Sequence, residues 1–305
     1  MKRTYLIMFF LAITVMGCSA QMLVGSYNIR YKNNGDSING NVWGKRCQVI
    51  CDQLNFMSPD VFGAQEVLHE QLVDMLERLD GYDYIGVGRD DGKHSGEYAA
   101  IFYKTEQLRL LEDGHFWLSE TPARPGLGWD AACVRICTWG RFARQTATDD
   151  EAFYFFNLHM DHVGVIARRE SAKLIVAKIR EIAKGAPVVV TGDFNVDQTD
   201  EIYSIFTQSG LLMDSFAAAR LRFAENGSFN SFDSNLYTES RIDHIFVSPS
   251  AVVESYGLLT NSYWLPDRDA EERVQGHDAP REISFSKYVR RLPSDHYPVF
   301  VRLSL

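Results

Sequence analysis

Apolar residues follow two different spacings along the chain. Short apolar runs bounded by polar turn residues predict strands, and apolar residues three or four positions apart predict helices. The predicted helices cover residues 43–57, 68–79, 165–183 and 201–208. The predicted strands cover residues 22–29, 60–65, 82–87, 99–103, 108–111, 134–139, 152–158, 187–191, 244–247, 251–259 and 297–303. Strands that alternate with helices in this way favour an α/β fold.

Residues 261–292 interrupt this pattern. The segment is polar and contains proline together with Trp264, His277, Arg290 and Arg291. We expect a loop with little regular structure, and its length indicates a functional rim rather than a simple connection.

The N-terminus forms a separate segment. Lys2 and Arg3 precede an almost entirely apolar stretch at 5–16, which is shorter than the roughly 20 residues that cross a bilayer. This pattern predicts a signal peptide over residues 1–20. Residues 15–18 resemble a bacterial lipobox, which would leave Cys18 lipidated, although the small residues after Gly17 also fit ordinary cleavage. We therefore expect an exported domain over residues 21–305, either a cell-envelope lipoprotein anchored to the membrane at Cys18 or a periplasmic or secreted protein.

Composition adds two restrictions. The chain has 305 residues, 46% of them hydrophobic, which is enough for one large domain or two small ones. Its net charge of -9 disfavours non-specific binding of nucleic acid, because that affinity comes mainly from lysine and arginine. A bound metal or a local basic cleft would still permit a phosphate substrate.

Four cysteines lie beyond the predicted signal peptide. Cys47 and Cys51 are four positions apart in a predicted helix, and Cys133 and Cys137 are four apart in a strand-like run. Neither spacing is that of the usual C-x2-C metal site, so we expect buried thiols or one disulfide.

Polar side chains occur just past the ends of many predicted strands. In chain order they are Asn28, Glu66, Glu97, His159, Asp193, Asn195, Asp243, Asp295 and His296. Each alone is typical of a turn or a structural residue. Together they make five carboxylates, two amides and two histidines, and functional groups in α/β folds gather at strand ends. The set therefore predicts a site.

The residue types indicate the chemistry of this site. Carboxylate and amide oxygens suit Mg²⁺ or Mn²⁺ better than zinc. Such an ion neutralises phosphate oxygens and can activate water. A carboxylate beside an amide, as in Asp193 and Asn195 of TGDFN, can orient that water. Histidines supported by carboxylates can contact phosphate as cations or transfer protons.

Five short stretches carry a family resemblance. SYNIR, GAQE, GDFN, RIDHIF and SDHYPV, in this order, resemble the endonuclease/exonuclease/phosphatase superfamily over residues 22–304. The resemblance implies a four-layer α/β sandwich, with two mixed β-sheets packed face to face and helices outside. It also implies a metal-dependent phosphoester hydrolase.

The resemblance further implies a role for each matching residue. Glu66 would be the main Mg²⁺ ligand, helped by Asn28 and Asp295 directly or through water. Asp193 would orient or deprotonate the attacking water. Asn195 would hold that water or a phosphate oxygen.

The remaining matches concern the phosphate. His296 would contact the scissile phosphate, and Asp243 would fix its ring. His159 would have Glu97 as its carboxylate partner. Arg135 fits either a phosphate-contacting arginine or a simple surface ion pair.

The stretch GRDDGKHSGE permits two interpretations. Arg89, Lys93 and His94 could approach a phosphate, or the stretch could form a solvated hairpin loop. Trp117, further along, is more typical of a core residue than of a platform on which a base stacks.

Several substrates remain open. The first expectation is a phosphodiesterase or nuclease that hydrolyses a P–O bond by in-line attack of water, with nucleic acid as a candidate substrate. The alternatives are a phosphomonoesterase acting on a sugar phosphate or nucleotide, a sphingomyelinase-like enzyme, an inositol phosphatase, or an inactive protein that binds phosphorylated ligands. We expect a monomer without a protein partner.

Overall fold

The computed structural model describes residues 21–267, 273–274, 278 and 280–305. The predicted signal peptide, with the lipobox at Cys18, lies outside the described residues. No helix within the described ranges has both the length and the apolar character needed to cross a bilayer.

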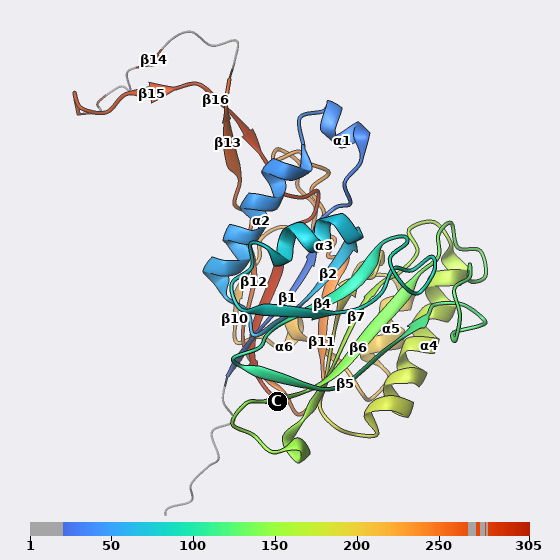
Figure 1. Ribbon diagram of the computed structural model, residues 1–305. Coiled ribbons are helices and arrows are strands. Elements are labelled where there is room, and N and C mark those ends of the chain that lie inside the picture. The colour runs from blue at the N-terminus through green and yellow to red at the C-terminus, as the bar shows by residue number, and fades with distance from the viewer. Residues whose placement is uncertain (1–20, 268–272, 275–277, 279) are drawn as a thin grey trace, which may run out of the picture.

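Two mixed β-sheets form the centre of the molecule (Figure 1). The larger sheet has the strand order β10 (Leu221–Phe223), β12 (Val252–Leu258), β17 (Val299–Ser304), β1 (Met22–Asn28), β2 (Val61–Val67), β4 (Tyr98–Lys104) and β3 (Tyr82–Ile85). The smaller sheet has the order β5 (Leu108–Trp117), β6 (Ile136–Arg144), β7 (Phe153–His159), β8 (Val188–Asp193), β11 (Asp243–Val247) and β9 (Met213–Asp214). β1 is parallel to β2 and β7 is parallel to β8, whereas β11 is antiparallel to β8.

Helices cover the outer face of each sheet (Figure 1). The helices on the larger sheet are α2 (Trp43–Met57) and α3 (His69–Leu76). Those on the smaller sheet are α4 (Val165–Ala183) and α5 (Glu201–Thr207). Short helical turns occupy connections, namely α1 (Asn34–Ile38), η1 (Asp149–Glu151) and α6 (Ser215–Ala218).

Apolar side chains fill the spaces between these layers. Val24 of β1 belongs to the cluster between the sheets, with Val189, whereas its neighbour Leu23 belongs to the cluster under α2, with Ile50. Strands buried on both faces read as continuous apolar runs, which is why their positions could be predicted. The architecture is the expected four-layer α/β sandwich, with two sheets face to face and helices outside.

The element bounds show where prediction succeeds and fails. α2 and α4 begin and end at the predicted residues. β5 continues to Trp117, six residues beyond the predicted end at Leu111, and pairs with β6 on both sides of a register shift between Leu110 and Glu112. Its extension contains half-buried and exposed residues such as Glu112 and Asp113, because β5 is an edge strand whose outer positions face water. An apolar pattern therefore does not extend over it.

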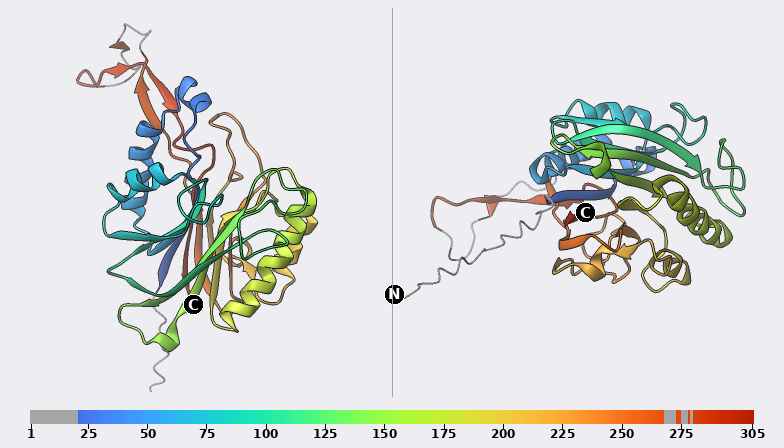
Figure 2. Two further views of the ribbon diagram at one scale, coloured as in Figure 1. Left: turned by 45° about the vertical axis from the view of Figure 1, so that its right-hand side comes forward. Right: turned by 90° about the horizontal axis from the view of Figure 1, so that it is seen from below.

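Within residues 261–292, the described part contradicts the expectation of a loop with little regular structure, and His277 lies outside the described residues. β13 (Tyr263–Pro266) pairs antiparallel with β16 (Tyr288–Arg291), and β14 (Arg273–Val274) pairs with β15 (Phe285–Ser286). The β13–β16 ribbon projects from the body of the sandwich beside α1 (Figures 1 and 2). Both of its faces meet solvent in part, so its sequence lacks the apolar face that identifies a strand of a packed sheet.

All four cysteines of the domain are free thiols. Cys47 and Cys51 are buried one turn apart on α2, and Cys137 is buried in β6. Burial raises the pKa of the Cys137 thiol well above its ordinary value. Of the two sequence expectations, buried thiols are therefore confirmed for these three residues and the disulfide is wrong.

Candidate active site

The strand ends bring the predicted polar residues to one edge of the sandwich. The carboxyl ends of β7 and β8 lie together, and Asp243, at the start of β11, is the register partner of Asp193. These ends border a pocket of about 570 Å³. Its lining consists of Arg30, Tyr31, Glu66, Arg89, Glu97, Cys133, Arg135, His159, His162, Asp193, Asn195, Phe229, Ile242, Asp295 and His296. Every predicted site residue is among them except Asn28 and Asp243, which are buried and hydrogen-bonded to lining residues.

Glu66 lies at an irregularity in β2. The register between β2 and β4 shifts between Ala64 and Val67, and Glu66 has a φ of 60° in the left-handed region. A bulge of this kind re-aims a side chain, and such a backbone costs about 1–3 kcal/mol in a residue other than glycine. Asn28 stabilises the result, because its Nδ2 donates to Glu66 Oε1 at 3.0 Å and to Asp193 Oδ2 at 3.0 Å.

Glu66 and Asp295 face a common cation. Arg30 Nη1 lies 3.4 Å from Asp295 Oδ2 and 4.0 Å from Glu66 Oε2. Burial raises the pKa of Asp295; the nearby His296 opposes this shift and the Glu66 charge adds to it. A divalent cation would relieve the crowding of these two buried carboxylates, and their all-oxygen donor set fits a hard ion such as Mg²⁺.

His296 is held between two carboxylates. Its Nδ1 donates to Asp243 Oδ2 at 2.8 Å, and its Nε2 lies 3.7 Å from Asp193 Oδ2. Burial alone would lower the pKa of His296, but Asp243 and Asp193 together raise it to about 10. Burial and the Asp243 charge raise the pKa of Asp193 to about 7. At neutral pH the site therefore holds an imidazolium beside a carboxylate of unusually high basicity.

Asn195 connects Asp193 to His159. Its backbone N–H donates to Asp193 Oδ1 at 3.0 Å, and it has a φ of 51°. Its Nδ2 donates to Met160 O at 3.0 Å and lies 3.2 Å from His159 Nε2. The amide nitrogen is thus committed, and the Oδ1 atom is left to act as an acceptor. Burial, followed by the charges of Arg135 and Arg89, lowers the pKa of His159 well below its ordinary value, so this ring is neutral.

Glu97 has a different partner from the expected one. Its Oε2 accepts a 2.6 Å hydrogen bond from Arg89 Nη1, and His159 Nδ1 has no hydrogen-bond partner among the described residues. The turn at 88–97 explains why Glu97 pairs with Arg89 rather than with His159. The Arg89 backbone N–H donates to Glu97 O and brings the two side chains together. Glu97, Arg89 and His159 still border one small cavity of about 10 Å³.

Arg135 is buried, with 4% of its surface exposed, so a simple surface ion pair is wrong. Its Nε donates to Asp161 Oδ2 at 3.4 Å, and its Nη2 donates to His162 Nδ1 at 3.0 Å. Because guanidinium can only donate, His162 must accept at Nδ1 and therefore carries its proton on Nε2.

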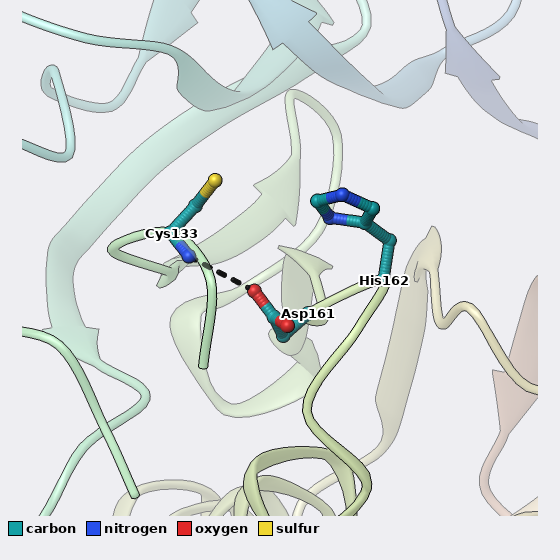
Figure 3. A group of neighbouring side chains, drawn as sticks. All are labelled: Cys133, Asp161 and His162. Carbon is teal, nitrogen blue, oxygen red and sulfur yellow. Dashed lines mark hydrogen bonds between the residues drawn. The ribbon is translucent and has the colours of Figure 1, made fainter. Parts of the chain in front are cut away.

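Asp161, Cys133 and His162 lie within metal-binding distance of one another, but Asp161 is already saturated. Figure 3 shows the Cys133 backbone N–H donating to Asp161, with the His162 ring beside it. The other donors to Asp161 are the backbone N–H groups of Ala132, Val163 and Gly164 and the Arg135 guanidinium. Although burial opposes it, these backbone donors and Arg135 lower the pKa of Asp161 to about 2. Asp161 thus anchors two loops rather than presenting a free ligand oxygen.

Some lining residues have no counterpart in the sequence predictions. Arg30 lies two positions after Asn28, and His162 lies three positions after His159, so both follow residues that the motifs identify. Phe229 lies in a stretch rich in serine and asparagine, where no spacing signals a function.

The fold and this arrangement of carboxylates, amides and histidines define a phosphoester hydrolase. The sequence model of the Endonuclease/Exonuclease/phosphatase family matches residues 25–296, and the chain belongs to this family. Members of the family hydrolyse phosphoester bonds and depend on a divalent metal ion.

Two solved structures are similar to the whole domain. The mannosyl-6-phosphatase of Bacteroides thetaiotaomicron is 49% identical, with a TM-score of 0.84, and the match covers 93% of this chain and 100% of that one. A second family protein from Bacteroides thetaiotaomicron is 48% identical, with a TM-score of 0.85, covering 93% and 98%.

Likeness to the curated eukaryotic relatives is more limited. Nocturnin of Xenopus laevis is 24% identical over 184 residues, which is 57% of this chain and 45% of nocturnin. The chain spans less than half the length of the curated relatives that it matches.

Proposed function

We propose that the chain is a Mg²⁺-dependent phosphomonoesterase that releases phosphate from a sugar phosphate. The observation that carries this proposal is an arginine-lined pocket at the predicted metal ligands, in a chain about half identical over its length to a mannosyl-6-phosphatase. Arg30, Arg89 and Arg135 reach the pocket from three different loops. Each guanidinium has five N–H donors and retains some of them for the oxygens of a terminal phosphate.

The first part of the mechanism is placement of the phosphate. Glu66 and Asp295 would hold the divalent ion, and Asn28 orients Glu66 by its hydrogen bond. When bound, the ion supplies positive charge that neutralises phosphate oxygens. The His296 imidazolium donates to a non-bridging oxygen, and Asp243 keeps it protonated.

The second part is activation of water. Asp193 accepts a proton from the attacking water, and its raised pKa of about 7 makes it an effective base near neutral pH. Asn195 Oδ1 accepts the other hydrogen and fixes the direction of attack. A bond forms between the water oxygen and phosphorus as the bond to the sugar oxygen breaks. The products are inorganic phosphate and the sugar. The leaving sugar oxygen takes up a proton from solvent, and Asp193 releases to solvent the proton that it accepted from the water.

A phosphodiesterase acting on nucleic acid is the second candidate. Family membership favours it, since the family includes nucleases. The net charge of -9 favours a small substrate instead, because nucleic-acid affinity depends mainly on neutralisation of phosphates by basic side chains.

One substrate panel tests the choice. The chain from Ser19 to Leu305 would be assayed with Mg²⁺, and with chelator, on hexose 6-phosphates, aryl phosphate mono- and diesters, plasmid DNA and RNA. We expect metal-dependent phosphate release from the hexose phosphates that is lost in Asp193→Ala. Cleavage of DNA, RNA or the diester without hydrolysis of any monoester would overturn the proposal.

We also propose export, with a lipid on Cys18 as the anchor. The basic, apolar and small-residue order of residues 1–20 supports this proposal. Metabolic labelling with a fatty acid should mark the full chain, and Cys18→Ala should abolish the label. A labelled Cys18→Ala chain, or an unlabelled wild type, would contradict the lipid anchor.

A further inference from the structure

Phe229 presents an apolar ring to the pocket. Phe229 has 42% of its surface exposed, and no other large apolar residue among the described lining residues is more than a third exposed. Its ring packs edge to face on His296, with centroids 5.0 Å apart and an interplanar angle of 69°. The remaining surface of the ring is therefore beside the group that contacts phosphate in the proposed mechanism.

The backbone fixes Phe229 to the catalytic segment. Phe229 and His296 form an antiparallel β-bridge. On either side of this bridge, Asn230 N donates to Asp295 O at 2.7 Å, and Tyr297 N donates to the backbone carbonyl oxygen of residue 228 at 2.7 Å. The Phe229 backbone therefore cannot move relative to the His296 backbone without breaking these bonds.

The loop that carries Phe229 has a strained backbone and is hydrogen-bonded to the start of β11. Ser231 and Phe232 have φ values of 54° and 60°, in the region that disfavours residues other than glycine. The buried Ser228 Oγ accepts from Ile242 N and Asp243 N at 3.0 Å each. Strain of this kind persists where the surroundings impose it, and it clusters at functional sites.

We propose that Phe229 is a specificity-determining residue that stacks on the ring of the substrate's alcohol group, so that the substrate is a cyclic sugar phosphate. This inference rests on the proposed function. A pocket of about 570 Å³ is far larger than a phosphate ion, and pockets of this size hold whole small molecules. The C–H face of a hexose ring is apolar and can cover an exposed aromatic face, whereas its hydroxyl edge can meet the polar part of the pocket lining.

Two primary alkyl phosphates separate ring recognition from chemistry. Mannose 6-phosphate carries a ring, glycerol 3-phosphate does not, and both release a primary alcohol. For Phe229→Ala we expect kcat/KM on mannose 6-phosphate to fall about 10- to 100-fold, mainly through KM. The value on glycerol 3-phosphate should stay within about twofold of wild type, because the reacting groups are untouched. Phe229→Tyr should restore the preference for the ring, and Phe223→Ala, an exposed phenylalanine on β10 away from the pocket, is the matched control.

Equilibrium binding makes the test independent of turnover. The dissociation constants of mannose 6-phosphate and inorganic phosphate would be measured by calorimetry for wild type and Phe229→Ala with Mg²⁺ present. We expect the dissociation constant of mannose 6-phosphate to rise about tenfold and that of inorganic phosphate to stay unchanged. Equal losses of affinity for both ligands, or of kcat/KM for both substrates, would show that Phe229 merely supports His296 and would overturn the inference. No loss of affinity or of kcat/KM would also overturn it. Phe229-dependent binding without hydrolysis would refute the proposed function and leave the ring contact standing.

Discussion

Two cavities of nearly equal size lie at opposite ends of β8. The active-site pocket, of about 570 Å³, borders Asp193 at the end of the strand. The other, of about 550 Å³, borders Val188 at its start, and we call it the basal cavity. Its lining consists of Ile179, Arg180, Ala183, Lys184, Gly185, Ala186, Pro187, Val188, Gly210, Leu211, Ser248, Pro249 and Ser250. The active-site pocket has four carboxylates in its lining, and the lining of the basal cavity has none.

The difference shows that space alone does not define a site in this fold. The basal cavity lies where chains turn between α4 and β8, and Gly185 and Pro187 there serve the turn. At the other end of β8, Asp193 and Asn195 are held by side chains from neighbouring strands. Cavities of nearly equal volume thus border turn residues at one end of β8 and a cluster of buried titratable side chains at the other.

Of the changes that test this difference between the two cavities, removal of divalent metal should have the largest effect on activity. Chelation should lower activity on the order of 10³-fold or more, because the ion contributes several kcal/mol of charge stabilisation. Added Mg²⁺ should restore the activity. The measurement is turnover in metal-free buffer with residual metal checked by elemental analysis. Full activity in a protein that contains less than stoichiometric metal would contradict the expectation.

Asp193→Ala should have the next largest effect. Loss of the base should lower kcat about 10²- to 10⁴-fold. The free energy of unfolding should not fall in parallel, because the substitution removes the repulsion between the buried carboxylates of Asp193 and Asp243. Steady-state kinetics and denaturant unfolding would be measured together. Turnover near the wild-type value, with the same metal dependence, would refute the role given to Asp193.

Asp243→Asn should shift the pH dependence of kcat/KM. The Asp243 charge raises the pKa values of both His296 and Asp193. Its removal should lower both values, so both limbs of the bell-shaped profile should move to lower pH. At about pH 9 the variant should lose about tenfold in kcat/KM relative to its own maximum. A profile that keeps both limbs in place would show that these two groups do not control the reaction.

Asp161→Asn should affect stability more than chemistry. Asp161 is 1% exposed, and its pKa of about 2 lies below the ordinary value. A lowered folded-state pKa contributes stability above the unfolded value of about 3.9, and the contribution is lost as pH falls toward the folded value. At pH 7 we expect a loss of about 1–2 kcal/mol in the free energy of unfolding.

Denaturant unfolding at several pH values tests whether the stabilisation by Asp161 is lost as the pH falls. The difference between wild type and Asp161→Asn should shrink between about pH 4 and pH 2. A difference that stays constant over that range would mean that hydrogen-bond geometry, rather than the charge of Asp161, stabilises the two loops.

Arg180→Ala, in the basal cavity, should have the smallest effect. Surface substitutions away from special features change stability by about 0.5 kcal/mol or less. Activity on the best substrate should stay within about twofold of wild type. A large loss of metal-dependent activity would show that the two ends of β8 are coupled and would undo the contrast drawn above.

The sequence predicts most of what depends on a single segment. α2 and α4 have a continuous apolar face, so their ends could be placed to the residue. Asp193 and Asp243 were expected at one site because they follow or begin apolar strands, and their strands are indeed neighbours.

Features that depend on the approach of two segments could not be predicted. Glu97 pairs with Arg89 because a turn brings them together, although His159 was the expected partner. Phe229 and Asp161 gain their positions from backbone bonds to distant loops. The β13–β16 ribbon lacks a buried face and therefore lacks the apolar period on which the strand predictions depend.

The base of that ribbon has a consequence for how this protein can vary. Tyr263 and Arg291 are register partners, so the chain leaves and re-enters the sandwich at one rung. Just below it, the buried Arg46 donates to Ile29 O and Pro293 O and ties the re-entry point to the body. Beyond this rung the chain can lengthen at a loop-closure cost of about 0.6 kcal/mol per doubling. The ribbon can therefore change in length while the segment that follows it, with Asp295 and His296, keeps its place.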